Sequence, residues 1–248
     1  MIVEFVDGGA ADRDVLVVPV TTGGLADATA LLPESFRPLA ATATQQARFD
    51  GAAGAVFETF VAQGAVVRRL LLVGAGAGDA AGYERAGAGL TARLIASGAT
   101  AVYADLTGVA ADCAARFALG AVLRGWRMDR YRTRLPAKQK ATLDRIAIGG
   151  AAAGSEAAWA QLRAVAEGVA FTRELVAEPG NIIYPQSFVD RCSALADAGI
   201  TIDVLDEAAM TDLGMGAIVG VGQGSARPPR LLCMEWKGAG APDGAPLL

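Results

Sequence analysis

Short apolar runs, bounded by glycine or polar residues, recur along the first 150 residues of the chain. They predict strands over residues 15–20, 55–62, 66–74, 100–106 and 144–148, with a turn at Gln63-Gly64 between the second and third. Stretches of helical character predict helices over residues 35–48, 83–97 and 110–125. Because strands and helices alternate after residue 66, we expect a mainly parallel sheet covered by helices.

The pattern changes after the small-residue run Gly149–Gly154, which we interpret as a boundary. A long helix follows, which we expect Ser155 to cap and Pro179 to stop. Beyond it the sequence predicts strands over 200–205, 216–221 and 230–236, and helices over 185–198 and 206–213. The last residues, Pro246–Leu248, are typical of the opening of a further strand, so the chain looks interrupted.

This pattern predicts an α/β protein in three parts. Residues 1–150 form an amino-terminal domain, residues 151–178 an interdomain helix, and residues 179–248 the incomplete start of a second α/β domain. The chain has 248 residues, of which 53% are hydrophobic and 19% charged, which favours a substantial core over disorder. Because alanine and glycine supply much of that hydrophobic share, we expect packing of small side chains.

Charge and targeting signals narrow the function class. A net charge of −4 weighs against a general nucleic-acid surface, which needs clustered cations. Met1–Phe5 lacks the start of a secretory signal, and no run has the length of a membrane span. We therefore expect a cytoplasmic protein without a membrane partner.

The chain contains no histidine, which excludes Ser-His-Asp and Cys-His catalysis and every histidine-based zinc motif within it. The cysteines Cys113, Cys192 and Cys233 are far apart and form no CxxC pair. We interpret all three as buried free thiols.

Two glycine loops are the main candidates for ligand binding. Gly74–Asp79 lies between a strand and a helix, as a nucleotide-binding loop does, but Asp79 would repel a pyrophosphate, and Asp105 lies too far along the chain to be the usual ribose ligand. Gly220–Arg230 carries Arg227 and Arg230, which could pair with an anion, but it lacks the P-loop spacing. For both loops we favour a structural turn.

No other constellation forms an active site. The acid pairs Glu167 with Glu174 and Asp203 with Asp206 are typical of solvated charge. Ser187 and Ser225 lack a nucleophile context. Cys192 lies within a helix and has no histidine partner, which favours a core thiol.

Aromatic and cationic residues alternate in the run Arg124–Arg132, which continues to Arg134. Such a stripe can bind nucleic acid through phosphate pairing and stacking. It can also be a helix end where Trp126, Met128 and Tyr131 pack inward while the arginines extend outward, and overall acidity favours this second interpretation.

The second half of the chain resembles the leucyl aminopeptidase (cytosol aminopeptidase) family. The matching residues follow in order and spacing: Arg173–Asn181, Tyr184-Pro185, Ser187-Phe188, Leu205–Glu207, Met210, Leu213–Ala217, Val219–Ser225 and Arg227–Leu231. Leu71–Gly76 and Arg124–Tyr131 resemble the amino-terminal domain of the same family more loosely.

The resemblance implies a macro-domain-like amino-terminal domain followed by a metallopeptidase domain. Family members use two divalent cations, Zn²⁺ or Mn²⁺, to release amino-terminal residues from peptides, and they assemble as homo-hexamers. Their ligands lie in GKGxxFDxGG-like and NTDAEGR-like motifs, which this chain does not contain. We therefore expect the ligands beyond Leu248, assign no catalytic, metal-binding or cofactor-binding residue within the chain, including Asp203, Asp206 and Glu207, and expect the chain alone to be inactive.

The alternative function is a non-catalytic, macro-like binding or regulatory module for a nucleotide derivative or DNA. Its support in the sequence is the Arg124–Arg134 run and the loop that begins at Gly74.

Overall fold

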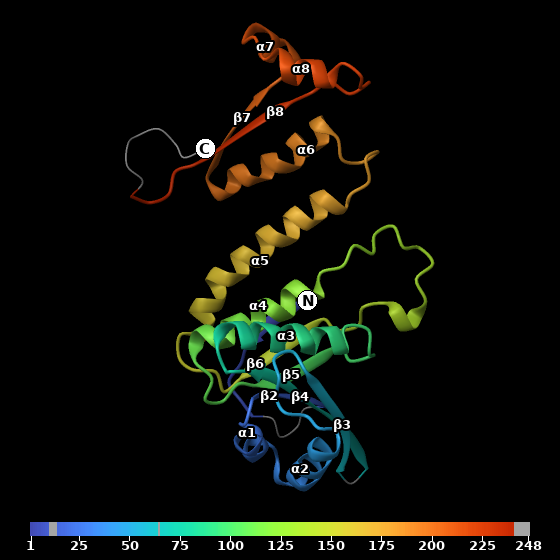
Figure 1. Cartoon of the computed structure of the whole chain (residues 1–248), viewed down its shortest axis with the longest axis vertical. Coiled ribbons are helices and arrows are strands. Elements are labelled where there is room, and N and C mark those ends of the chain that lie inside the picture. The colour runs from blue at the N-terminus through green and yellow to red at the C-terminus, as the bar shows by residue number, and fades with distance from the viewer. Residues whose placement is uncertain (10–13, 64, 241–248) are drawn as a thin grey trace. The chain divides into compact units, whose positions relative to one another are not determined.

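Six strands form one sheet in the order β1-β6-β5-β2-β4-β3 (Figure 1). The computed structural model describes residues 1–9, 14–63 and 65–240. All neighbouring strands pair in parallel except β3 and β4, which form an antiparallel hairpin, so the predicted mainly parallel sheet is confirmed. The strands are β1 (Ile2–Phe5), β2 (Val15–Thr21), β3 (Val56–Gln63), β4 (Val66–Gly76), β5 (Ala101–Asp105) and β6 (Arg145–Gly149).

Helices cover both faces of this sheet (Figure 1). α1 (Leu25–Leu31) and α2 (Arg37–Gln46) lie on one face, and α3 (Ala80–Leu94) and α4 (Ala111–Gly125) lie on the other. Each interface has its own hydrophobic core, and the neighbours Leu16 and Val17 of β2 belong to different cores. Because successive strand residues point to opposite faces, a strand that is buried on both sides is apolar throughout.

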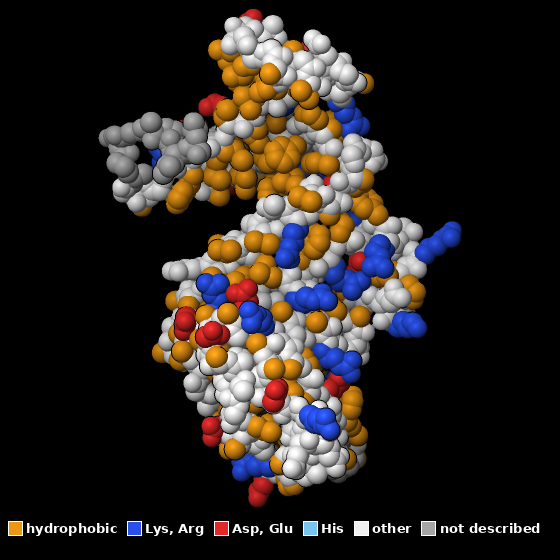
Figure 2. Space-filling model, in the orientation of Figure 1, with side chains coloured by type: hydrophobic (Ala, Val, Ile, Leu, Met, Phe, Trp, Pro, Cys, Tyr) orange, Lys and Arg blue, Asp and Glu red, His pale blue; other side chains and the backbone are white. Residues whose placement is uncertain are grey.

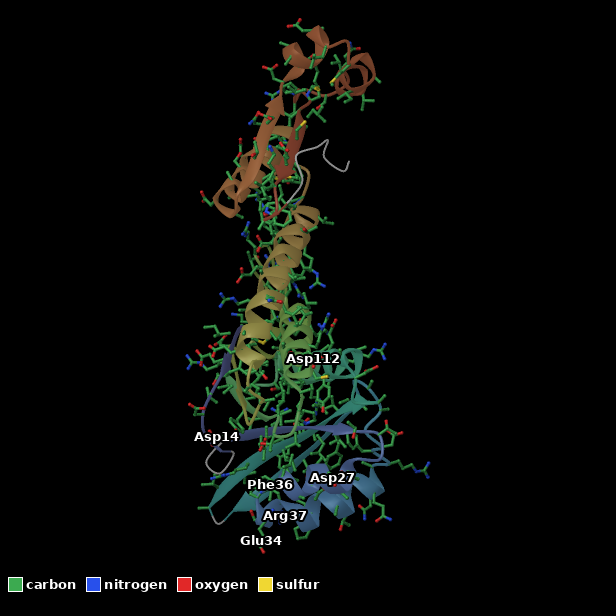
Figure 3. All side chains as sticks on the ribbon, turned by 90° about the vertical axis from the view of Figure 1, so that its left-hand side faces the viewer. Asp14, Asp27, Glu34, Phe36, Arg37 and Asp112 are labelled. Atoms are coloured by element: carbon green, nitrogen blue, oxygen red, sulfur yellow. The ribbon has the colours of Figure 1, made fainter. Side chains whose placement is uncertain are left out.

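Phe36 packs the segment between α1 and α2 against the sheet, and Arg37, the first residue of α2, contacts the end of α1 (Figure 3). Phe36 lies in the 3₁₀ turn η1 (Glu34–Phe36) and is 1% exposed in the core beneath the sheet. The Arg37 guanidinium donates to the carbonyl oxygens of Ala30 and Leu32, each at 2.9 Å. It thereby satisfies carbonyl groups at the end of α1 that have no partner within the helix.

Glycine lets α3 and α4 approach closely. A Cβ atom built on Gly87 of α3 would lie 1.9 Å from the carbonyl oxygen of Phe117, and one on Gly120 of α4 would lie 1.8 Å from that of Glu84. No side chain fits at these distances, so the expected packing of small residues is confirmed at this interface.

The long helix α5 (Ser155–Ala177) follows β6 and buries Trp159 and Ala166 in the core beneath α3 and α4. The prediction that Ser155 caps it is wrong. Ser155 is the first helical residue, and its hydroxyl donates to the carbonyl oxygen of Ala152 at 2.6 Å rather than accepting from a helical amide. The preceding Gly154, with φ 89°, turns the chain so tightly that the serine lies already inside the helix.

The chain divides into two units, residues 1–172 and 173–248. In the second unit β7 (Ile200–Leu205) and β8 (Leu231–Trp236) form an antiparallel pair. α6 (Pro185–Cys192) continues into the 3₁₀ helix η3 (Ser193–Ala198), which ends at Gly199 as predicted. α7 (Glu207–Asp212) is capped by Asp206, whose carboxylate accepts from the Ala209 amide at 2.9 Å.

The strand predicted over residues 216–221 is wrong, because this segment is the helix α8 (Gly216–Gly222). A short apolar run does not distinguish a strand from a helix by its periodicity. β7 and β8 form a two-stranded sheet, and the segment between α7 and β8 is not part of it. Gly214, with φ 71°, ends the preceding turn and lets the chain begin a new helix.

Two elements have no counterpart in the sequence prediction, β1 and α1. The four residues of β1 become a strand only through pairing with β6, which lies more than a hundred residues along the chain. Within the predicted loop 132–140 the structure forms one short 3₁₀ helix, η2 (Ala137–Gln139). The predicted strand at Pro246–Leu248 lies outside the described residues. None of the helices in the described ranges has the length and apolar character needed to cross a bilayer.

Candidate functional site

A cavity of about 560 Å³ opens beside the carboxyl ends of β1 and β6. Its lining is formed by Phe5–Gly8, Ile148 and Gly150–Glu156. The carboxyl ends of parallel strands are where α/β proteins commonly bind ligands. The cavity therefore lies where this class of fold commonly binds ligands; the sequence predicts a boundary at Gly149–Gly154 but no site there.

A hydrogen bond from Tyr103 anchors the loop after β1, which borders this cavity. The Tyr103 hydroxyl donates to the carbonyl oxygen of Gly8 at 2.6 Å, and a Cβ atom on Gly149 would lie 1.9 Å from that same hydroxyl oxygen. Gly149 is thus required so that the tyrosine can reach the loop after β1.

The lining of the cavity does not select one class of ligand. Its floor is mostly backbone and alanine, and the amino-terminal end of α5 favours a negative charge. The exposed carboxylates of Asp7 and Glu156 line the same cavity and oppose an anion. A nucleotide derivative would have to place its phosphates beside these acids.

The Gly74–Asp79 loop is structural, as the sequence analysis favoured. A Cβ atom on Gly74 would lie 1.9 Å from the carbonyl oxygen of Ala52. Asp79 caps α3, because its carboxylate accepts from the Gly82 amide at 2.7 Å. Asp105 accepts from the Thr107 amide at 3.0 Å within a turn. The loop and the two acids therefore stabilise the ends of elements.

The three cysteine thiols differ in how far they are buried. Cys113 and Cys192 are buried, as predicted, but Cys233 is exposed on β8, so the expectation of three buried thiols is wrong. Burial raises the pKa of both Cys113 and Cys192, and the nearby Asp112 and Asp79 raise that of Cys113 further. Burial also raises the pKa of Tyr83, next to Cys113. Both buried thiols therefore stay protonated at neutral pH and are poor nucleophiles.

In the second unit, Arg227 links the Gly220–Arg230 loop to the segment before α6. Its guanidinium lies 3.8 Å from the ring centroid of Tyr184 and donates to the carbonyl oxygen of Gly180 at 3.2 Å. Arg230 donates to the side-chain oxygen of Gln186 at 2.8 Å. Both arginines thus bind the protein's own groups, which supports the structural interpretation of this loop.

A buried ion pair lies nearby in the same unit. The Glu178 side chain is 0% exposed and accepts from the Arg191 guanidinium at 2.9 Å. The sequence predicts only a helix end at Glu178, because an ion-pair partner 13 positions away cannot be identified from spacing alone.

The other residues that were considered for catalysis do not come together in one site. Glu167 forms an exposed pair with Arg163, and Asp203 lies on β7 opposite Cys233. The Ser187 hydroxyl accepts from the Tyr184 amide at 2.9 Å at the start of α6. The Ser225 hydroxyl accepts from the Arg227 amide at 3.0 Å.

A divalent metal centre does not fit the described residues. Across residues 1–9, 14–63 and 65–240, no group of three or more Cys, Asp or Glu side chains is placed so that it could hold a metal ion.

The α/β fold of this chain is similar to that of a solved leucine aminopeptidase. A solved structure of a tomato leucine aminopeptidase mutant has a TM-score of 0.78 and 23% identity, and the match covers 93% of this chain and 49% of that one. The bottromycin maturation enzyme BotP in complex with Mn has a TM-score of 0.68 and 28% identity, over 89% of this chain and 44% of that one.

The sequence comparisons give the family. The amino-terminal domain of the cytosol aminopeptidase family matches residues 17–135, and its catalytic domain matches residues 170–248. The chain belongs to the cytosol aminopeptidase family.

Curated relatives carry the same name. A probable cytosol aminopeptidase of Bradyrhizobium is 37% identical over 241 residues, 89% of this chain and 48% of that protein. One of Nitrobacter hamburgensis is 38% identical over 95% of this chain and 49% of that protein. The chain thus spans about half the length of the curated relatives it matches.

Proposed function

We propose that this chain is part of a leucyl aminopeptidase-type metalloexopeptidase, which releases amino-terminal residues from peptides. One observation carries the proposal: the two domains of the family match the chain in the family's own order, first over residues 17–135 and then over residues 170–248. The proposed division into an amino-terminal domain (1–150), an interdomain helix (151–178) and the start of a catalytic domain (179–248) has the same support.

We propose that residues 1–248 contain neither the catalytic nor the metal-binding residues. The GKGxxFDxGG-like and NTDAEGR-like ligand motifs of the family do not occur in the sequence, which supports this. The metals would be two divalent cations, Mn²⁺ or Zn²⁺; a similar solved protein is a complex with Mn. When bound, such cations would supply Lewis-acid activation of the scissile carbonyl and a water of lowered pKa.

The role we propose for this chain is to provide the scaffold around the catalytic site. Its first unit provides a six-stranded sheet with a core on each face, and its second unit provides the helices and the strand pair with which the catalytic domain would begin. Assembly into a homo-hexamer and a cytoplasmic location belong to the same proposal, and the name of the relatives, cytosol aminopeptidase, supports the location.

The test has two arms. The purified 248-residue chain is assayed on leucine p-nitroanilide with added Mn²⁺ or Zn²⁺, and we expect no turnover. The product of the complete reading frame is assayed in the same way, and we expect metal-dependent turnover that a chelator abolishes.

Turnover by the 248-residue chain would show that its own residues form the site. A reading frame that stops at Leu248, or a longer product without activity on leucine anilides and leucine-containing peptides, would remove the peptidase assignment.

A further inference from the structure

Cations are concentrated in one segment of the first unit, residues 124–140, called here the cationic segment. It carries seven of the 22 Lys and Arg residues of the chain and a single carboxylate, that of Asp129. Figure 2 shows Lys and Arg side chains gathered on one side of this unit. The whole chain has a net charge of −4, so the segment has the opposite sign to the molecule.

Hydrogen bonds within the cationic segment use only part of its positive charge. The Asp129 carboxylate accepts from Arg127 at 2.6 Å and from Arg132 at 3.3 Å. The hydrogen bond from Arg127 is the main reason that the pKa of Asp129 lies below its usual range. Four further cations are exposed, and within the described ranges none of them has an ion-pair partner: Arg124, Arg134, Lys138 and Lys140.

The apolar side chains of the cationic segment differ in burial. The sequence analysis favoured inward packing of Trp126, Met128 and Tyr131. Trp126 and Met128 are half-buried, but Tyr131 is 48% exposed. The inward-packing interpretation is therefore wrong for Tyr131, and side-chain burial decreases within a few residues of the end of α4.

The second unit contains a segment of the opposite sign, residues 192–226, called here the acidic segment. It carries five carboxylates and neither Lys nor Arg, and the chain has no histidine. All five side chains are exposed, and in the part of the chain that the structure describes none of them forms an ion pair. These residues are Asp197, Asp203, Asp206, Glu207 and Asp212.

The acidic segment also exposes large apolar side chains. Leu213 is 62% exposed and Val221 is 88% exposed, and Val204 and Ile218 each expose about two fifths of their surface. A surface that combines exposed apolar side chains with charge has the composition of a protein–protein interface, in which an apolar centre is surrounded by a polar rim.

We propose that the cationic segment of one copy of this chain binds the acidic segment of a second copy. Every copy carries both surfaces, and their charges without ion-pair partners, four cations and five carboxylates, nearly cancel on contact. Attraction between surfaces of opposite charge speeds encounter and selects the partner.

The proposed contact joins two different surfaces, so it is heterologous, and each copy keeps one surface for a further copy. Contacts of this kind close into a ring when the rotation between copies allows it, which agrees with the proposed homo-oligomer. The proposal goes beyond peptide hydrolysis and does not depend on it, so its test needs no measurement of turnover.

The first experiment measures sedimentation velocity of the 248-residue chain at about 1–100 μM, the range of weak reversible association. We expect self-association in about 50 mM KCl that is at least about tenfold weaker in about 500 mM KCl, because salt screens attraction between exposed charges. Association through apolar surfaces alone would not weaken in salt, so that outcome would contradict the proposal.

The second experiment reverses charges on each surface in turn. Lys138→Glu/Lys140→Glu and Asp203→Lys/Asp212→Lys should each weaken self-association at least about tenfold, because like charges then lie opposite each other. Neither variant changes Asp206, which caps α7. An equimolar mixture of the two variants should regain the association, since each reversed segment then meets a reversed partner.

The matched control is Arg48→Glu/Arg85→Glu, which reverses two exposed cations outside the segment and should keep the native association. Circular dichroism must show native structure in every variant. A reversed pair that does not fold is replaced by Lys138→Gln/Lys140→Gln or Asp203→Asn/Asp212→Asn, and each of these should also weaken association. A native chain that stays monomeric, an equal loss in the control, or a mixture that stays dissociated would each overturn the proposal.

Discussion

At the scale of single residues, surroundings decide chemistry more than residue type does. Cys113 and Cys192 are buried, which raises the pKa of both thiols, whereas Cys233 is exposed on β8. Because the thiolate is the reactive form, the exposed Cys233 should react faster than the buried, protonated Cys113 and Cys192.

We predict that one thiol per chain reacts rapidly with Ellman's reagent at pH 8, and that all three react in denaturant. The Cys233→Ser variant should lose the rapid phase, whereas Cys192→Ser should keep it. A rapid phase that survives in Cys233→Ser would contradict the exposure assigned to these residues.

The stack of Arg227 on Tyr184 is a second feature at this scale. The guanidinium lies 3.8 Å from the ring centroid and also donates to the backbone of the segment before α6. We predict that Arg227→Ala and Tyr184→Ala each lower the free energy of unfolding. In a double-mutant cycle, denaturant titration should give a coupling energy of about 1 kcal/mol.

Tyr184→Phe is the matched control for this cycle, because it keeps the ring and should keep most of the coupling. Strictly additive effects of the two alanine substitutions would show that the stack contributes nothing to stability.

At the scale of elements, the agreement between prediction and structure depends on how local the signal is. β2 to β5 and α2 to α4 follow from apolar runs and helix signals within single segments, and the structure confirms them to within a few residues. α8 differs because a six-residue apolar run has no distinctive period, so its sequence does not distinguish a strand from a helix. β1 depends on a partner far along the chain.

The contact between α3 and α4 gives a prediction at this scale. Gly120→Ala would bring a methyl group against the backbone of Glu84 and should destabilise the protein by about 1–3 kcal/mol, the usual cost of overpacking. Gly168→Ala, in the exposed part of α5 where nothing lies within 4 Å of the added carbon, should instead stabilise by about 0.5–1 kcal/mol.

Thermal or denaturant unfolding of both variants tests whether the free energy of unfolding falls in Gly120→Ala and rises in Gly168→Ala. If Gly120→Ala were as stable as Gly168→Ala, the two helices would not pack as closely as the structure has them.

At the scale of the whole molecule, apolar surface is unevenly distributed. Half of the large exposed hydrophobic side chains of the described residues lie in residues 173–240, among them Val176, Leu213, Val221 and Trp236. Exposed apolar patches of this kind mark surfaces that associate with something else.

We predict that the folded 248-residue chain enhances the fluorescence of 8-anilinonaphthalene-1-sulfonate. Val221→Ser/Trp236→Ser should reduce the enhancement, and Phe60→Ser/Val67→Ser, an equal change in the first unit, should reduce it less. Circular dichroism must show native structure in each case, and no enhancement by the native chain would contradict the exposure of these side chains.

The sequence by itself determined the fold class, most elements and the family, because strand and helix periods and an ordered block of residues from Arg173 to Leu231 are local signals. It also determined that histidine chemistry is absent from this chain. Only the tertiary structure decided which side chains are paired and which are exposed to solvent. It paired Arg227 with Tyr184 and Glu178 with Arg191, left Tyr131 and Cys233 exposed, and opened the cavity beside β1 and β6. The reason is physical: pairing and exposure depend on neighbours that distant parts of the chain supply. The separation of two residues along the sequence does not give the distance between them in space.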